Sequence, residues 1–205
     1  TYTIDTTPPT GTITINSGAA STNSANITLS LSCSDAQGCS QMQFANDNVT
    51  YSTPEAYATT KAWTLTSGDG TKTIYVKFKD TTGNWSTAYS NTILLDTTAP
   101  NTIALPRGGT YNSTQSVTLS CSDGTGSGCD KIYYTTDGST PITSSTVYSS
   151  PINILVTSTL NFFATDLAGN SERVRIETYT ISTNMVTVEL KDSTGNPLSG
   201  GVVQY

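Results

Sequence analysis

The chain repeats its own sequence with a period of about 90 residues. Three short motifs occur twice and in the same order: DTTPP at residues 5–9 and DTTAP at 96–100, LSLSCSD at 29–35 and VTLSCSD at 117–123, KDTTGN at 79–84 and TDLAGN at 165–170. A repeat of this length is the size of one β-sandwich domain and is much longer than a solenoid repeat. The sequence therefore predicts two similar domains in series, an organisation more typical of spacing or adhesion than of chemistry.

Apolar and polar residues alternate along many short segments. The clearest is 74–79, where Ile74, Val76 and Phe78 fall on one face and the residues between them are polar or aromatic. A period of two predicts a strand in a sheet with one buried face. Turn signals separate such segments, and no segment has a helical period. The predicted fold class is all-β, with two tandem immunoglobulin-like β-sandwiches and a partial third β unit at the C-terminus.

The repeat also predicts the domain boundaries. We expect residues 1–5 to be the tail of a preceding domain or a linker, 6–96 and 97–182 to be the two sandwiches, and 183–205 to begin a further, incomplete β-domain. A two-stranded piece is marginal on its own. The chain is therefore expected to be a segment of a longer protein.

Composition narrows the range of partners. Only 12% of the residues are charged, Lys and Arg number 9, histidine is absent and the net charge is −6. Nucleic acid is not expected as a partner because phosphate binding needs clustered basic residues. No apolar run approaches the roughly 20 residues of a membrane helix, and no signal peptide is seen.

The four cysteines form two local pairs, one in each repeat. Cys33 and Cys39 flank one short glycine-containing loop, and Cys121 and Cys129 flank its counterpart. Two disulfides would imply an oxidising compartment, so an extracellular or cell-surface location is expected. The alternative is zinc, which needs four converging ligands where each repeat offers two cysteines and no histidine.

No catalytic constellation is visible in the sequence. A serine or cysteine nucleophile would lack its usual histidine base. Paired carboxylates can hydrolyse glycosides, but the candidates lie in turn motifs: Asp35, Asp80, Asp123, Asp137 and Asp166. We therefore predict that the chain is not an enzyme.

Calcium is the candidate ligand that the sequence suggests, and no other cofactor is expected. The acidic linker residues Asp5 and Asp96 could combine with the turn residues Asp80 and Asp166 to offer hard oxygen ligands. The alternative is that each aspartate caps a turn while proline stiffens the linker. Both interpretations stay open at the level of sequence.

Aromatic residues offer two further hypotheses. A sugar-stacking platform could be built from several of them, although core packing competes with this role: Tyr51, Tyr57, Trp63, Trp85 and Tyr111. Strand alternation places Tyr75, Tyr133 and Phe163 on outward faces. Exposed aromatic residues on a sandwich would mark a ligand or partner surface.

Longer motifs carry resemblances to known families. The first domain, through WTL at 63–65, GDGTKTIYV at 68–76 and DTTGNWS at 80–86, resembles bacterial immunoglobulin-like modules of large surface and secreted proteins. The second, through YYTTDGSTP at 133–141, YSSPI at 148–152 and TLNFFATDLAGN at 159–170, is similar to the chitobiase/β-hexosaminidase C-terminal module. Residues 183–205 are similar to the opening of carboxypeptidase-regulatory-like or prealbumin-like domains. These resemblances imply a fold more than a function, because such modules are accessories of many proteins.

Three functional hypotheses follow. The leading one is a non-catalytic structural segment of an extracellular or cell-surface bacterial protein, such as a stalk, an adhesin shaft or a filament component. One alternative is a carbohydrate-binding accessory region of a secreted glycoside hydrolase, and another is a fibre subunit that assembles by β-strand donation from unpaired strands at the chain ends. The expected partners are other domains of the same longer chain, identical subunits in a fibre, or surface polysaccharide.

Overall fold

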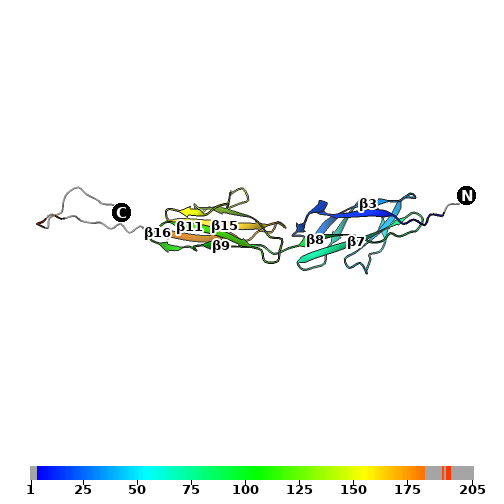
Figure 1. Ribbon diagram of the computed structural model, residues 1–205, viewed down its shortest axis with the longest axis horizontal. Helices are drawn as coiled ribbons and strands as arrows, with labels where there is room; N and C mark the ends of the chain where they lie inside the picture. The colour runs from blue at the N-terminus through cyan, green and yellow to red at the C-terminus, as the bar shows by residue number, and fades with distance from the viewer. Residues whose placement is uncertain (1–3, 183–190, 192, 195–205) are drawn as a thin grey trace. The chain divides into compact units, whose positions relative to one another are not determined.

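The computed structural model describes residues 4–182, 191, 193 and 194. Within these residues the regular structure consists of β-strands and one short 3-10 turn, η1 (Asn16–Gly18) (Figure 1). The strands form two β-sandwiches, which confirms the predicted all-β, immunoglobulin-like class. The expected third β unit at 183–205 and its candidate donor strand lie almost entirely outside the described residues.

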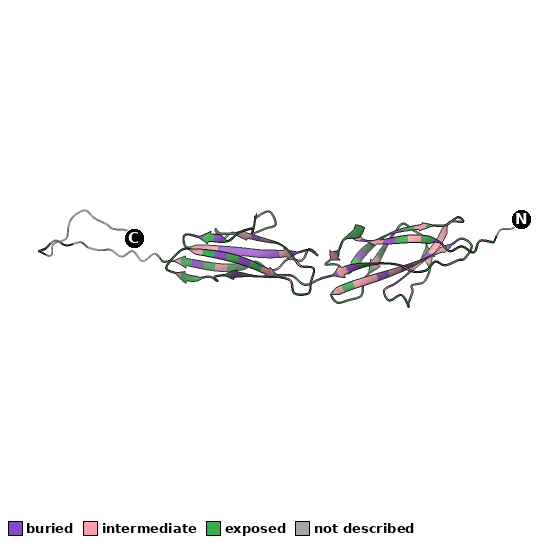
Figure 2. Ribbon diagram, viewed as in Figure 1, coloured by how far each residue is buried: buried purple, intermediate pink, exposed green. Residues whose placement is uncertain are grey.

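The first sandwich consists of a three-stranded and a five-stranded sheet. The smaller sheet has the order β1 (Thr10–Ile15), β3 (Asn26–Ser34), β6 (Thr60–Thr64), and the larger has the order β2 (Ser21–Thr22), β8 (Tyr89–Leu95), β7 (Gly70–Asp80), β4 (Cys39–Ala45), β5 (Glu55–Ala56). Pairing is antiparallel except that the short β2 runs parallel to β8. The core lies between the sheets because every second residue is buried along 27–31 of β3 and 74–80 of β7, as the alternating colours in Figure 2 show.

The second sandwich repeats this plan. Its smaller sheet has the order β14 (Ile152–Ile154), β11 (Gln115–Ser122), β9 (Asn101–Leu105), and its larger sheet has the order β10 (Gly109–Tyr111), β16 (Arg175–Ile181), β15 (Ser158–Asp166), β12 (Cys129–Thr135), β13 (Thr146–Val147). The short β10 pairs in parallel with β16, as β2 does with β8. Tyr179, Phe162 and Leu160 are fully buried in its core. Equivalent strands therefore end at equivalent turns: β7 at Asp80 and β15 at Asp166.

The compact units of the structure do not coincide with the two sandwiches. Residues 4–101 group with 121–131 and 164–172 in one unit, and the second unit holds 102–120, 132–163 and 173–182. The linker residue Asp96 thus belongs to the same unit as the turns that carry Asp123 and Asp166. The surroundings of Asp96 are therefore one local structure.

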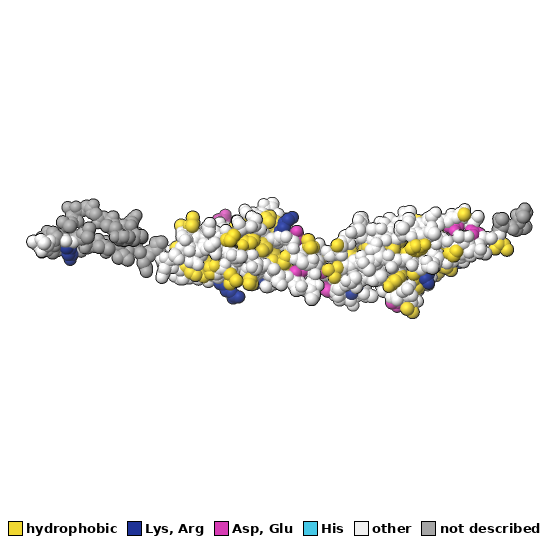
Figure 3. All heavy atoms as spheres, viewed as in Figure 1, with side chains coloured by type: hydrophobic (Ala, Val, Ile, Leu, Met, Phe, Trp, Pro, Cys, Tyr) yellow, Lys and Arg dark blue, Asp and Glu magenta, His cyan; other side chains and the backbone are white. Residues whose placement is uncertain are grey.

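The described part of the chain contains no helix of the length and apolar character needed to cross a bilayer. Charged side chains are few and scattered on the face shown in Figure 3, where most atoms are the white of the backbone and of side chains that are neither charged nor hydrophobic.

Candidate functional site

Two groups of three aspartates occupy equivalent positions in the two repeats. The first aspartate cluster is Asp5, Asp35 and Asp80, and the second is Asp96, Asp123 and Asp166. In each cluster, every member contributes a carboxylate oxygen that lies within 4.8 Å of the others. One member comes from the linker before the sandwich, one from the cysteine loop and one from the turn that ends β7 or β15.

Hydrogen bonds fix the position of Asp80, the turn aspartate of the first cluster. Asp80 Oδ1 accepts the backbone N–H groups of Thr82, Gly83 and Asn84 at 2.8, 2.6 and 2.8 Å. The Asn84 side-chain amide donates to Asp80 Oδ2 at 2.7 Å and to the Asp5 carbonyl at 3.0 Å. Burial alone would raise the pKa of Asp80, but the hydrogen bonds from Asn84, Thr82 and Gly83 outweigh it and lower the pKa to about 2. Asp80 is therefore an anion at neutral pH although only 1% of its surface is exposed.

In the second cluster Asn170 makes the hydrogen bonds that Asn84 makes in the first. Asn170 donates its backbone N–H to Asp166 Oδ1 at 2.7 Å, and its side-chain amide donates to Asp166 Oδ2 at 2.7 Å and to the Asp96 carbonyl at 2.8 Å. In both repeats the side-chain amide of one asparagine thus joins the turn aspartate to the linker. We call this pair of hydrogen bonds the asparagine clamp. Because the asparagine is four residues after the aspartate, the turn itself sets this geometry.

The cysteine loops bring in the third aspartate. Cys33 is bonded to Cys39 and Cys121 to Cys129, which confirms both predicted disulfides and rules out a zinc site built from these thiols. The Thr81 N–H donates to the Gly38 carbonyl at 3.1 Å across the first loop and turn, and the second repeat has the equivalent bond. Each disulfide therefore closes a short loop that is held against the turn and carries the third carboxylate.

The clusters contain carboxylate oxygens that have no protein partner. Asp5 Oδ2 in the first cluster and Asp123 Oδ1 in the second are buried and accept no hydrogen bond. Burial raises the pKa of Asp123; the Gly128 N–H opposes this rise, whereas the Asp96 and Asp166 carboxylates add to it. The other oxygen of each carboxylate does accept a hydrogen bond, from Thr7 N–H at Asp5 and from Gly128 N–H at Asp123. A buried carboxylate oxygen without a donor is costly unless a positive charge lies beside it.

Asp96 is the most buried member, with 0% of its surface exposed. Its Oδ1 accepts the Thr98 N–H at 3.1 Å and its Oδ2 accepts the Ser127 N–H at 2.6 Å. Burial would raise its pKa, but the hydrogen bonds from Ser127 and Thr98 prevail and hold the pKa below its ordinary value. Asp96 thus contributes a negative charge to the cluster at neutral pH.

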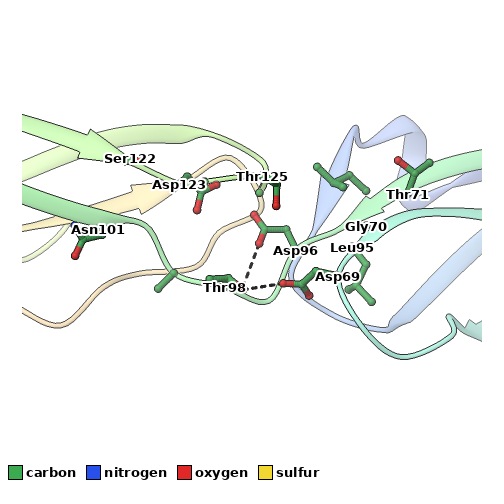
Figure 4. A pocket seen from close by; sticks show the side chains of 14 residues that line it. Asp69, Gly70, Thr71, Leu95, Asp96, Thr98, Asn101, Ser122, Asp123 and Thr125 are labelled. Carbon is green, nitrogen blue, oxygen red and sulfur yellow. Dashed lines mark hydrogen bonds between the residues drawn. The ribbon is translucent and has the colours of Figure 1, made fainter.

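A pocket of about 660 Å³ opens beside the second cluster. Asp96, Asp123 and Asp69 lie on its walls (Figure 4). Asp69 Oδ1 accepts the N–H and the hydroxyl of Thr97 at 3.0 and 2.8 Å, and its Oδ2 accepts the Thr98 hydroxyl at 2.8 Å. The pocket therefore presents carboxylates and hydroxyls, which suit a cation better than an anion. The same bonds fix the linker to the turn before β7.

The sequence anticipated part of this site. The structure brings Asp5 beside Asp80 and Asp96 beside Asp166, the two pairs named as calcium candidates, whereas metal binding itself stays a prediction. Asp35 and Asp123 were expected only to cap turns, and their place in the clusters was missed. The available signal was the repeated SCSD motif, which puts an aspartate two residues after a disulfide cysteine in each repeat.

The expected exposure of Tyr133 and Phe163 is wrong. Each is only 7% exposed, and their rings stack with centroids 5.2 Å apart. They come from the neighbouring strands β12 and β15, so on the outer face of the sheet each ring covers the other. Tyr75, the third residue predicted to be exposed, is half-buried.

The candidate sugar platform does not form one surface. Trp63 packs beside Phe44 in the first core, Tyr57 meets Phe78 edge-on, and Tyr111 stacks on Tyr179 in the second core. Tyr51 and Trp85 instead lie under the ammonium groups of Lys77 and Lys79, at 4.5 and 5.7 Å from the ring centroids. In the first sandwich, the aromatic residues that a ligand could still reach are the half-buried Tyr51, Tyr75 and Trp85.

The second repeat matches a known family. Residues 106–176, about a third of the chain, match the family model described as "Chitobiase/beta-hexosaminidase C-terminal domain". No curated protein matches the chain.

Several solved structures are similar to the chain at low identity. The fibronectin(III)-like modules of Clostridium thermocellum CbhA are 14% identical, with a TM-score of 0.48 over 88% of this chain and 99% of that one. The D00-D0 domain of intimin is 11% identical, with a TM-score of 0.43 over 83% and 100% of the two chains. A tetra-tandem repeat in the extending region of a large adhesion protein is 16% identical, with a TM-score of 0.31 over 85% and 50%. The chain is a tandem of immunoglobulin-like modules, the second of which is similar to the chitobiase/beta-hexosaminidase C-terminal domain, as its motifs predicted.

Proposed function

We propose that this chain is a non-catalytic structural segment of an extracellular or cell-surface bacterial protein, in which it acts as a stiff spacer within a stalk, an adhesin shaft or a filament. The observation that carries this proposal is the asparagine clamp, which ties the linker before each sandwich to a turn of that sandwich in both repeats. A flexible tether would need no such bonds. A spacer that transmits force or holds a distance benefits from them.

The second linker is also held on its other side. The Asp69 carboxylate accepts three hydrogen bonds from Thr97 and Thr98, and the proline at 100 restricts the backbone shortly afterwards. Within one compact unit the linker therefore has partners on both sides. These bonds limit the dihedral freedom through which two serially joined domains would bend.

The two disulfides support the proposed location. Both close short loops, and such bonds persist in oxidising environments outside the cytosol. They also resist local opening of the loops under load.

Small-angle X-ray scattering tests the spacer. We expect the wild-type curve to be reproduced by a narrow ensemble of inter-domain orientations. The double variant Asp69→Ala/Asn170→Ala, which removes the bonds on both sides of the linker, should require a broad ensemble. Wild-type scattering that fits two freely tumbling sandwiches would count against the proposal.

A carbohydrate-binding accessory role is the second candidate, and the family match at residues 106–176 favours it. The protein should then sediment with insoluble chitin or cellulose, and Tyr134→Ala, which removes a ring that lines a pocket of this second module, should weaken the binding. Sedimentation that does not exceed that of an unrelated acidic protein would eliminate this role.

A further inference from the structure

We propose that each aspartate cluster binds a calcium ion, so that the chain carries two sites, one at the linker that precedes each sandwich. The inference goes beyond the spacer function and does not depend on it. Carboxylate oxygens are the ligands that Ca²⁺ prefers, and each cluster brings three of them together from three separate segments.

The buried oxygens without partners point to a ligand. Asp5 Oδ2 and Asp123 Oδ1 are shielded from water and accept no hydrogen bond from the protein, although each belongs to a group of three carboxylates. Asp47 and Asp137, which cap turns outside the clusters, are exposed, so their remaining oxygens are open to water. An oxygen that no protein group satisfies, next to other anions, needs a cation.

The spacing of the oxygens fits the size of Ca²⁺. Ligands at 2.3–2.6 Å from an ion can be at most about 4.6–5.2 Å apart, so oxygens within 4.8 Å of one another fit around one calcium ion. Mg²⁺ is usually held by one or two carboxylates and several waters in strict octahedral geometry, whereas each cluster offers three carboxylates from the protein. The clusters are therefore better suited to Ca²⁺ than to Mg²⁺.

The hydrogen bonds around the clusters prepare them for an ion. Asn84 and Asn170 orient the turn carboxylates and the linker, and the disulfides hold the loops of Asp35 and Asp123. At the second cluster a Cβ added to Gly126 would lie 2.5 Å from Asp123 Oδ2 and 2.8 Å from Asp96 Oδ2. Only glycine lets the loop approach these two carboxylates so closely.

Calorimetric titration of the metal-free chain with CaCl₂ tests the proposal. We expect two ions per chain, with dissociation constants of about 0.1–1 mM, the range of extracellular calcium modules. Asp35→Asn and Asp123→Asn should each remove one ion and leave the other. The matched control is Asp137→Asn, because Asp137 caps an exposed turn through Ser139 and belongs to neither cluster.

Thermal unfolding provides a second readout. About 10 mM CaCl₂ should raise the wild-type melting temperature by about 5 °C or more relative to NaCl of equal ionic strength, and MgCl₂ should raise it less. The Asp35→Asn/Asp123→Asn double variant should show no calcium-dependent rise. In chelator it should be at least as stable as the wild type, because it has lost the repulsion between carboxylates. A purely structural role for these aspartates predicts the same loss of stability with and without calcium.

Three results would overturn the proposal. They are a wild-type melting temperature that calcium leaves unchanged, a calcium response that the double variant retains, and equal responses to Ca²⁺ and Mg²⁺. Because the wild-type measurement alone can give the first and third results, the test does not depend on the variants folding.

Discussion

The asparagine clamp gives the sharpest test of how this fold holds its linkers, through the substitution Asn170→Ala. The side-chain amide of Asn170 donates one hydrogen bond to the turn carboxylate of Asp166 at 2.7 Å and one to the Asp96 carbonyl at 2.8 Å. A bond to a charged group contributes about 1.5–3 kcal/mol and a neutral one about 0.5–1.5 kcal/mol. The substitution should therefore lower the free energy of unfolding of the second sandwich by about 2–4 kcal/mol.

Differential scanning calorimetry and urea unfolding measure this loss. The matched variant is Asn84→Ala, which removes the two equivalent bonds from the first repeat and a third one, to the Thr82 hydroxyl at 3.0 Å. Both tryptophans, Trp63 and Trp85, lie in the first sandwich. The unfolding transition followed by their fluorescence should therefore shift in Asn84→Ala and change little in Asn170→Ala. A change below about 0.5 kcal/mol in either variant, the usual range of surface substitutions, would refute the clamp.

Three further predictions concern the first core, the disulfide and the second core. Gly11→Ala should cost about 3 kcal/mol in urea unfolding, because the added Cβ would lie 2.4 Å from a ring carbon of the fully buried Phe78. Replacing Cys33 and Cys39 by serine should cost about 2 kcal/mol, the loop-closure entropy of a six-residue separation, measured against the reduced wild type as a control. Burial raises the pKa of Tyr179 to about 12, so between about pH 10 and 12 the unfolded state ionises while the folded state does not. Stability should fall by up to about 2.7 kcal/mol over this window as pH rises, and Tyr179→Phe should show a smaller fall; equal falls would contradict the assignment.

The strands could be predicted because the alternation of buried and exposed residues can be seen within each strand's own sequence. Along β7 the buried residues Ile74, Val76 and Phe78 alternate with half-buried ones, and a period of two needs no knowledge of the partner strand. The disulfides were predictable for the same reason, since each pair spans only a short loop.

The outer face of the second sandwich could not be predicted in this way. Alternation correctly places Phe163 opposite Phe162, but the burial of Phe163 depends on Tyr133, which is thirty residues earlier in the chain and reaches it only through the pairing of β12 with β15. The face of a residue is a local property. Its exposure is decided by its neighbours across the sheet.

The aspartate clusters show the same limit. Turn chemistry explains Asp80 and Asp166 one at a time, and the linker motif explains Asp5 and Asp96, but no local rule states that a cysteine loop brings a third carboxylate to each pair. The repeat could have revealed it, because all three positions recur together in both copies. Joint recurrence of residues that lie far apart in sequence is itself evidence that they meet.

The difference between the two cysteine loops strengthens the case that the clusters are sites and not accidents of packing. The paired cysteines are six positions apart in the first loop and eight in the second. In the longer loop the Ser127 N–H reaches Asp96 Oδ2, and the unsatisfied oxygen belongs to Asp123. The shorter loop supplies no such donor, and the unsatisfied oxygen is on Asp5, the counterpart of Asp96. Loop length thus changes which carboxylate is unsatisfied but leaves one buried oxygen without a donor in each cluster, as expected if each cluster leaves an oxygen for a cation.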